Sequence, residues 1–358
     1  INAATGTQMC SHWFSQSQWQ LPKAEQYAQL QKLFADRAGE LERDHSELVK
    51  EHGELSNACS GFTYIGQQDG TEGAIRYAPL AEPVLRIEPQ STGGELLKNY
   101  TGLYRKLNAD DVQLDAPLED NSTLGADQAA PLQLSAVVST GSLTETTNDL
   151  GDAGPMLYRL NVDDHFSYIK EPNSRIAPFN SDLRIAIRSI SEQTELKLPA
   201  SASGTLPSLK PKPIELRYGR LRLDNVYGPE VPAGDHLKVT MIAEYLTAEG
   251  MVVNLTDSCS TYLAQNMTLS HYQHNLDKGE ISLSGGGHFS AGQPLAEEQI
   301  RLSLPGEGNS GSVTLEYDAP AWLEDDWNDD GHLQDPKAQA RFGVRRGHDR
   351  VVHWLELH

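Results

Sequence analysis

Residues 183–190 read LRIAIRSI, and this short stretch decides which class of fold the chain adopts. Its apolar side chains stand at every second position, at Leu183, Ile185 and Ile187. Successive side chains of an extended strand point to opposite faces, so one face of this strand is expected to be buried and the other to meet water. Arg184 and Arg188 belong to the solvated face in this interpretation.

Short stretches rich in β-branched and aromatic residues recur on both sides of this strand, and clusters of Gly, Pro, Asn and Asp separate them. They include FTYIG, LQLSAVVST and HFSYI before it, and LKVTMIAEYLT, SVTLEYD and RVVHWLEL after it. This texture predicts a mainly β protein built from two tandem antiparallel β-sandwich domains of Ig-like type, because a parallel sheet would need crossover helices between its strands.

A proline- and serine-rich segment, PASASGTLPSLKPKP at residues 199–213, separates the two predicted domains. It has no sustained apolar pattern, which is typical of a semi-extended linker. The sequence therefore predicts a first β-sandwich over 59–198, a linker over 199–213 and a C-terminal β-sandwich over 214–358.

Residues 1–58 form a separate N-terminal segment with a helical pattern over 22–57. Apolar residues recur seven apart along it, at Tyr27, Phe34, Leu41, Leu48 and Leu55. Such a stripe predicts an amphipathic helix. Glycine inside a helix costs about 1 kcal/mol relative to alanine, so a break near Gly39 or Gly53 into a helical hairpin is an equally good interpretation.

Charge and hydropathy exclude several classes of partner. Lys and Arg number 29 against 50 Asp and Glu, which gives a formal net charge of -21. A negative potential of this size repels phosphate backbones, so nucleic acid is not expected as a partner. No stretch approaches the ~18 apolar residues that span a bilayer, so we expect no membrane span in this fragment. The first residues also lack the basic and apolar blocks of a signal peptide.

Only three cysteines occur, at Cys10, Cys59 and Cys259, which permits one disulfide in three possible pairings. This low number with wide spacing excludes a cysteine zinc ribbon and is typical of an extracytoplasmic protein with one disulfide. The pairing of Cys10 with Cys59 is favoured, because these two cysteines flank a discrete segment.

An acidic stretch near the carboxyl end, WLEDDWNDDGHLQDP at 322–336, contains the pattern D-x-N-x-D-G. Alternating oxygens followed by a glycine that permits a sharp bend are typical of a calcium loop. The predicted ligands are Asp326, Asn328, Asp330, the backbone carbonyl of His332, and Asp335. Lys337 stands where an EF-hand has its bidentate glutamate. The alternative is an acidic surface turn with Trp322 and Trp327 packed beneath it.

Other motifs have plainer interpretations. Gly306, Gly308 and Gly311 match G-x-G-x-x-G, but they join two predicted strands, which favours a glycine-rich hairpin loop over a dinucleotide site. The chain has no G-x-S-x-G nucleophile elbow, so no serine hydrolase is indicated. The basic residues Arg217, Arg220 and Arg222 are expected to pair with the surplus carboxylates. A sugar-stacking surface is the alternative use of nearby aromatics at Tyr218, Tyr227 and Trp354.

Six segments resemble one known family. RYGRLRLDNVYGPE (217–230), DSC (257–259), WLEDDWNDDG (322–331) and ARFGVRRGHDRVVHW (340–354) closely resemble, in this order, the C-terminal region of MshQ-like proteins. These are the biogenesis proteins Q of the mannose-sensitive haemagglutinin (MSHA) pilus, a type IV pilus of Gram-negative bacteria. CSGFTYIGQ (59–67) and KNYTGLYRKL (98–107) resemble the preceding module of that family. The resemblance covers roughly 59–358, and the helical segment before Cys59 departs from it.

The resemblance implies a large secreted protein on the cell surface that takes part in pilus biogenesis or attachment. Its implied partners are pilus subunits or other surface proteins, with host or surface glycans as a further class. We therefore expect a non-enzymatic structural or adhesive module stabilised by calcium. The alternatives are a calcium-dependent carbohydrate-binding domain and a hydrolase, which would need two acids facing one cleft at about 5–9.5 Å.

Overall fold

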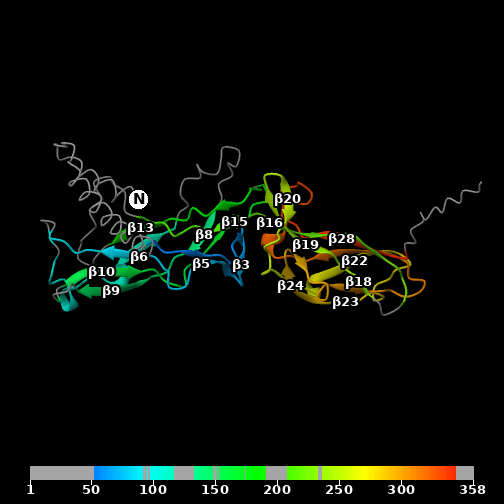
Figure 1. The fold of residues 1–358 in the computed structure, drawn as a ribbon, viewed down its shortest axis with the longest axis horizontal. Helices are drawn as coiled ribbons and strands as arrows, with labels where there is room; N and C mark the ends of the chain where they lie inside the picture. Colours follow the sequence, from blue (N-terminus) through cyan, green and yellow to red (C-terminus); the bar gives the residue numbers. More distant parts are fainter. Residues whose placement is uncertain are drawn as a thin grey trace, which may run out of the picture.

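The computed structural model describes residues 52–91, 95, 97–116, 133–147, 151, 153–173, 175–190, 208–232 and 236–343. Over these residues the chain is mainly β, with many small sheets (Figure 1). All but two of the paired strands run antiparallel to their neighbours in this part of the chain; the exceptions are β2 with β15 and β17 with β28. No helix in the same residues is long and apolar enough to cross a membrane.

Two hydrophobic cores divide the strands into two domains that lie end to end, one coloured blue to green and the other yellow to orange in Figure 1. The first domain contains β1 (Leu55–Ser56), β3 (Gln68–Asp69), β4 (Glu72–Gly73), β5 (Ile75–Tyr77), β6 (Val84–Ile87), β7 (Val112–Asp115), β8 (Leu134–Val137), β9 (Ser142–Thr147), β10 (Ala153–Arg159), β11 (His165–Tyr168), β12 (Phe179–Asn180), β13 (Ile185–Ile190) and β14 (Ser208–Leu209), with 3-10 turns η1 (Gly102–Tyr104) and η2 (Ala109–Asp111).

The second domain contains β16 (Gly219–Leu223), β17 (Val226–Gly228), β18 (His236–Lys238), β19 (Met241–Thr247), β20 (Gly250–Val253), β21 (Thr261–Leu263), β22 (Met267–His274), β23 (Leu283–Ser284), β24 (Gly286–Ser290), β25 (Gln293–Pro294), β26 (Arg301–Ser303), β27 (Gly311–Tyr317) and β28 (Lys337–Phe342), with 3-10 turns η4 (Ala264–Asn266) and η5 (Ala321–Leu323). Its largest sheet has the order β17-β28-β27-β22.

Strand β13 confirms the alternation from which the β class was predicted. Leu183, Ile185 and Ile187 are buried in the first core, whereas Arg188 is exposed and pairs with Asp115 of the neighbouring strand β7. The period-2 pattern therefore separates a buried face from a wet one, as an extended backbone requires.

The end of the predicted helix and the end of the predicted linker differ from those in the structure. Leu55 was expected on a helical stripe, but it lies in β1, buried and paired with Tyr77 of β5. The rest of the predicted helix, up to residue 51, lies outside the described residues. The predicted linker is also shorter at its C-terminal side, because β14 pairs with β13 and buries Leu209 in the first core. A single apolar residue beside a polar segment can belong to a helix, a strand or a linker, and its secondary structure is known only once its tertiary neighbours are known.

The glycine-rich loop after Arg301–Ser303 differs from the hairpin that its sequence predicts. Gly306 and Gly308 adopt positive φ angles of 96° and 89°, which favours glycine. However, β26 and β27 belong to different sheets and do not pair with each other. The loop is therefore a connection between sheets, and no helix follows it that could hold a pyrophosphate.

The two domains exchange chain segments where they meet. Strand β2 (Thr63–Tyr64) pairs parallel with β15 (Glu215–Arg217), which also pairs with β12. Phe62 and Tyr64 are buried in the second core, although they precede almost the whole first domain in sequence. Leu216 and Tyr218 are buried in the first core. We call this contact region, with β2, β15 and the loop 322–327, the joint.

Candidate functional site

Two carboxylates with no solvent exposure, Asp257 and Asp325, mark the joint. A buried charge is costly unless hydrogen bonds and opposite charges compensate it. The partners of these two carboxylates come from both domains, so the joint is a polar cluster that links distant parts of the described chain. It is therefore the candidate functional site.

Asp257 binds the strand that the first domain inserts. The hydroxyl of Tyr64 donates to its Oδ2 at 2.8 Å, and the amide of Ser260 donates to its Oδ1 at 3.0 Å. Asn254, which is fully buried, donates from Nδ2 to the Tyr64 hydroxyl at 2.7 Å. Burial, and then the charge of Asp257, raise the pKa of Tyr64 well above its usual value, so this hydroxyl stays protonated and keeps donating.

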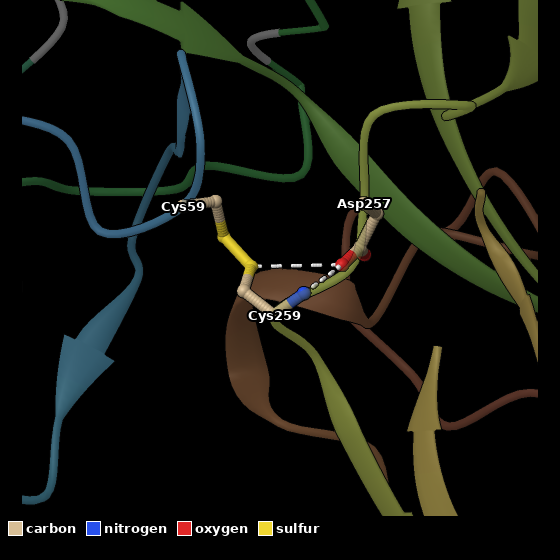
Figure 2. A group of neighbouring side chains, drawn as sticks. All are labelled: Cys59, Asp257 and Cys259. Atoms are coloured by element: carbon tan, nitrogen blue, oxygen red, sulfur yellow. Dashed lines mark hydrogen bonds between the residues drawn. A yellow bond between two sulfur atoms is a disulfide. The ribbon is translucent and has the colours of Figure 1, made fainter. Parts of the chain in front are cut away.

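A disulfide joins Cys59 to Cys259 beside this cluster, with a Cα–Cα distance of 5.5 Å (Figure 2). The favoured pairing of Cys10 with Cys59 is thus replaced, and Cys10 lies outside the described residues. The two bonded cysteines are 200 positions apart in sequence. Sequence proximity was the wrong guide, because the exchange of segments at the joint brings residue 59 into the second core.

The same cysteines and Asp257 are the one group of three or more His, Cys, Asp or Glu side chains in the described residues whose ligand atoms lie within 4.8 Å of one another. Oδ1 of Asp257 lies 3.5 Å from Sγ of Cys259 (Figure 2). Each cysteine sulfur is bonded to the other, whereas a metal would need free thiolates. In this oxidised form the group is a covalent cross-link and not a metal centre.

The side chain of Arg217, in β15, lies beside the Asp257 cluster and contacts its Asn254. Its guanidinium lies between the rings of Phe62, at 4.4 Å, and Tyr245, at 4.5 Å. It also donates to Oδ1 of Asn254 and to the Thr256 hydroxyl, both at 2.6 Å. A planar guanidinium between two aromatic faces gains cation–π attraction while its edge keeps its hydrogen bonds.

Asp325 is bonded by three side chains. Arg175, from the first domain, donates from Nε to Oδ1 at 3.1 Å, and the Tyr218 hydroxyl donates to the same oxygen at 3.0 Å. Arg220 donates to Oδ2 at 3.3 Å. Burial, and then the charge of Asp325, raise the pKa of Tyr218. Both oxygens of this buried carboxylate therefore have charged or strongly polar partners.

Lys170 extends from the first domain into the second. Its Nζ donates to the backbone carbonyls of Gly219 at 2.6 Å, Trp322 at 2.9 Å and Glu324 at 2.5 Å, and it lies 4.4 Å from the centre of the Tyr218 ring. Burial lowers the pKa of this amine to about 7, although the nearby charge of Asp325 opposes the shift. Through the carbonyls of Trp322 and Glu324, this amine holds the loop that carries Asp325 against the first domain.

The predicted calcium ligands lie next to this loop, where the chain's own donors already bind their oxygens. The two carboxylate oxygens of Asp326 accept the amides of Asp330 and Gly331, each at 2.9 Å. These backbone hydrogen bonds lower the pKa of Asp326 against a raising effect of burial. Oδ1 of Asp330 accepts the His332 amide at 3.1 Å, and Oδ2 accepts the Gln334 side chain at 2.8 Å.

The remaining predicted ligands point to other partners. The Asn328 amide nitrogen donates to Gln334 at 2.8 Å, and Asp335 accepts the Ala319 amide at 2.8 Å. Calcium needs six to eight converging oxygens. No three acidic or histidine side chains of this loop, which the structure describes in full, have ligand atoms within 4.8 Å of one another. The calcium site therefore stays a prediction from the sequence.

Instead, the loop binds cations that belong to the protein. Arg175 donates from Nη2 to the carbonyl of Asp326 at 2.6 Å and lies 3.5 Å from the carboxylate of Asp329. The guanidinium of Arg220 lies 4.9 Å from the centre of the Trp327 ring. The acidic segment thus binds the side chains of Arg175 and Lys170, which extend to it from the first domain.

The predicted pairing of the basic cluster is confirmed. Arg220 and Arg222 donate to the two oxygens of Glu244, each at 2.8 Å, and Arg217 donates to Glu215 at 2.6 Å. The alternative sugar-stacking surface loses one member, because Tyr218 is fully buried. Tyr227 is 57% exposed, and Trp354 lies outside the described residues.

Comparison with known protein families assigns both halves of the chain to one family. Residues 44–207 match the third domain of DUF6701, and residues 217–357 match its fourth domain. No curated protein matches the sequence. The nine residues between the two matches contain β14 and most of β15, which are the strands that lead into the joint. The chain therefore belongs to the DUF6701 family and contains that family's third and fourth domains.

Proposed function

We propose that this chain is a non-enzymatic structural module of an exported surface protein, in which two β domains are held in one fixed orientation. The observation that carries the proposal is the Cys59–Cys259 disulfide, which joins the start of the first domain to the middle of the second. Disulfides persist in oxidising compartments, so this bond supports a location outside the cytoplasm.

The polar contacts of the joint support a fixed orientation. Asp325 is bonded by Arg175 of the first domain and by Arg220 of the second, and Asp257 is bonded by Tyr64. Rotation of one domain against the other would separate these pairs and leave buried carboxylates without partners. Breaking a buried ion pair costs about 3–5 kcal/mol, so such a joint resists bending.

The use of the charged side chains supports a role without catalysis. A catalytic carboxylate has to face a substrate, but Asp257 and Asp325 are fully buried and bound by neighbouring side chains. The arginines of β15 and β16 are directed at Glu215, Glu244 and Asp325. The polar groups at the centre of the described chain are thus committed to holding the domains together.

The resemblance to MshQ-like proteins extends the proposal to a pilus-associated protein on the surface of a Gram-negative bacterium. Its role there is pilus biogenesis or attachment, and its partners are pilus subunits or other surface proteins. We further propose that each domain is an Ig-like β-sandwich. A fixed pair of such domains suits this role, because it sets the distance between the neighbours attached at its two ends.

The distance between the two domains tests the proposal. Spin labels on the exposed residues Thr144 and Ser284, in a Cys10→Ser background, report it by double electron–electron resonance. We expect one narrow distance distribution in the oxidised protein. The double variant Arg175→Ala/Lys170→Met should broaden it, whereas Arg188→Ala, which removes a surface pair, should leave it unchanged. A broad distribution in the parent protein would overturn the proposal.

A further inference from the structure

The disulfide determines which parts of the chain carry the force when the two ends of the chain are pulled apart. Cys59 and Cys259, 200 positions apart, enclose a loop that contains the first domain from β2 onward and strands β15–β20. A pull on the two ends of the chain passes from residue 59 through the sulfurs directly to residue 259. The enclosed loop carries no covalent tension as long as the bond is intact.

On the N-terminal side, the residues that the structure describes before the disulfide, 52–58, contain one short strand. Strand β1 pairs with β5 at two positions, Leu55 with Tyr77 and Ser56 with Arg76, and Glu54 forms one bridge with Lys212. Backbone hydrogen bonds with Ala78, Ala81 and Lys212 also hold residues 53–55, so tension from this side has to break these contacts before it reaches Cys59. Among the described buried residues of the first core, Leu55 is the one that lies outside the enclosed loop.

On the C-terminal side, the load meets strand β28, which is paired along both of its edges. Strand β28 follows Gln334, which pairs with Asp325 at the joint, and its six residues carry the chain about 20 Å onward. It pairs with β27 at six positions and with β17 at three. A pull along the axis of β28 loads these hydrogen bonds together instead of one after another, so this end resists extension.

We propose that the Cys59–Cys259 bond is a mechanical bypass, which lets tension pass through the second domain while the enclosed part of the first domain, after β1, stays folded and unloaded. The inference rests on the proposed function, since only a module within a surface assembly is pulled from its ends. The bypassed length is large: 200 residues reach at most about 3.3–3.6 Å each, or roughly 700 Å in total. Surfaces of the first domain would keep their native shape under load.

Single-molecule stretching of the full chain, with handles at its two ends, tests the bypass. The oxidised molecule should stop extending about 700 Å short of the reduced molecule. Addition of dithiothreitol to a stretched oxidised molecule at constant force should release that length. Cys10→Ser should behave like the parent chain, and Cys259→Ser should extend fully without reductant.

The contour length depends on covalent connectivity, so the dithiothreitol measurement on the parent chain decides even if Cys259→Ser fails to fold. Equal final lengths before and after reduction would overturn the bypass, and so would release of the enclosed loop before reduction. A narrow interdomain distance together with equal lengths would refute the bypass alone. A broad distance together with the 700 Å difference would refute the fixed orientation and leave the bypass in place.

Discussion

Arg175 of the first domain donates to the buried carboxylate of Asp325 in the second domain at 3.1 Å, and these two residues are 150 positions apart. The same guanidinium also binds the carbonyl of Asp326 at 2.6 Å. The acidic loop therefore receives a cation supplied by the neighbouring domain, and this contact sets how the two domains meet.

Arg175→Ala should destabilise the protein by about 3 kcal/mol. The substitution leaves Asp325 buried with Tyr218 and Arg220 but without its partner from the first domain. The midpoint of urea unfolding measures the change. The matched control is Arg188→Ala, whose pair with Asp115 has side chains 71% and 55% exposed and should be worth less than about 1 kcal/mol. Equal effects of the two substitutions would contradict the role given to Arg175.

Lys170 should make stability rise with pH above neutrality. Burial lowers its pKa to about 7, whereas an unfolded lysine titrates near about 10.4. Between these values the unfolded chain binds a proton that the folded chain does not, so the free energy of unfolding increases with pH by up to about 1.4 kcal/mol per unit. This stability is complete above the unfolded pKa and is lost as pH falls toward 7.

Lys170→Met isolates this contribution, because methionine cannot titrate. We expect the difference in unfolding free energy between the parent protein and Lys170→Met to shift in favour of the parent by about 2–3 kcal/mol from pH 7 to pH 9. Parallel pH profiles would mean that the amine keeps an ordinary pKa in the folded protein.

Calcium should leave the melting temperature unchanged. The carboxylate oxygens of Asp326 accept the amides of Asp330 and Gly331, and carboxylate oxygens of Asp330 and Asp335 also accept hydrogen bonds from the chain. Melting curves in millimolar calcium and in chelator should therefore coincide. Asp326→Ala should lower stability equally in both buffers, because it leaves two amides without an acceptor. A rise of several degrees in calcium, lost in Asp326→Ala/Asp330→Ala, would restore the calcium site.

The mainly β class follows from a local pattern, the alternation in residues 183–190. The pairing of the arginine cluster follows from the excess of acidic residues in the composition. The joint cannot be predicted from either feature. The D-x-N-x-D-G pattern draws attention to Asp326, whereas the carboxylate bound by a side chain of the first domain is Asp325, whose role depends on Tyr218 and Arg175. Cys59 likewise meets a cysteine 200 positions away because β2 enters the second domain. Contacts over such separations leave no local signal.

The pairing of the cysteines tests the central claim most directly. Peptide mapping by mass spectrometry, on protein exported from the cytoplasm and digested without reductant, should identify one cross-linked pair that contains Cys59 and Cys259. That result would place a covalent bond across the joint. A cross-link between Cys59 and Cys10, or a free thiol at Cys59, would contradict both the fixed joint and the bypass.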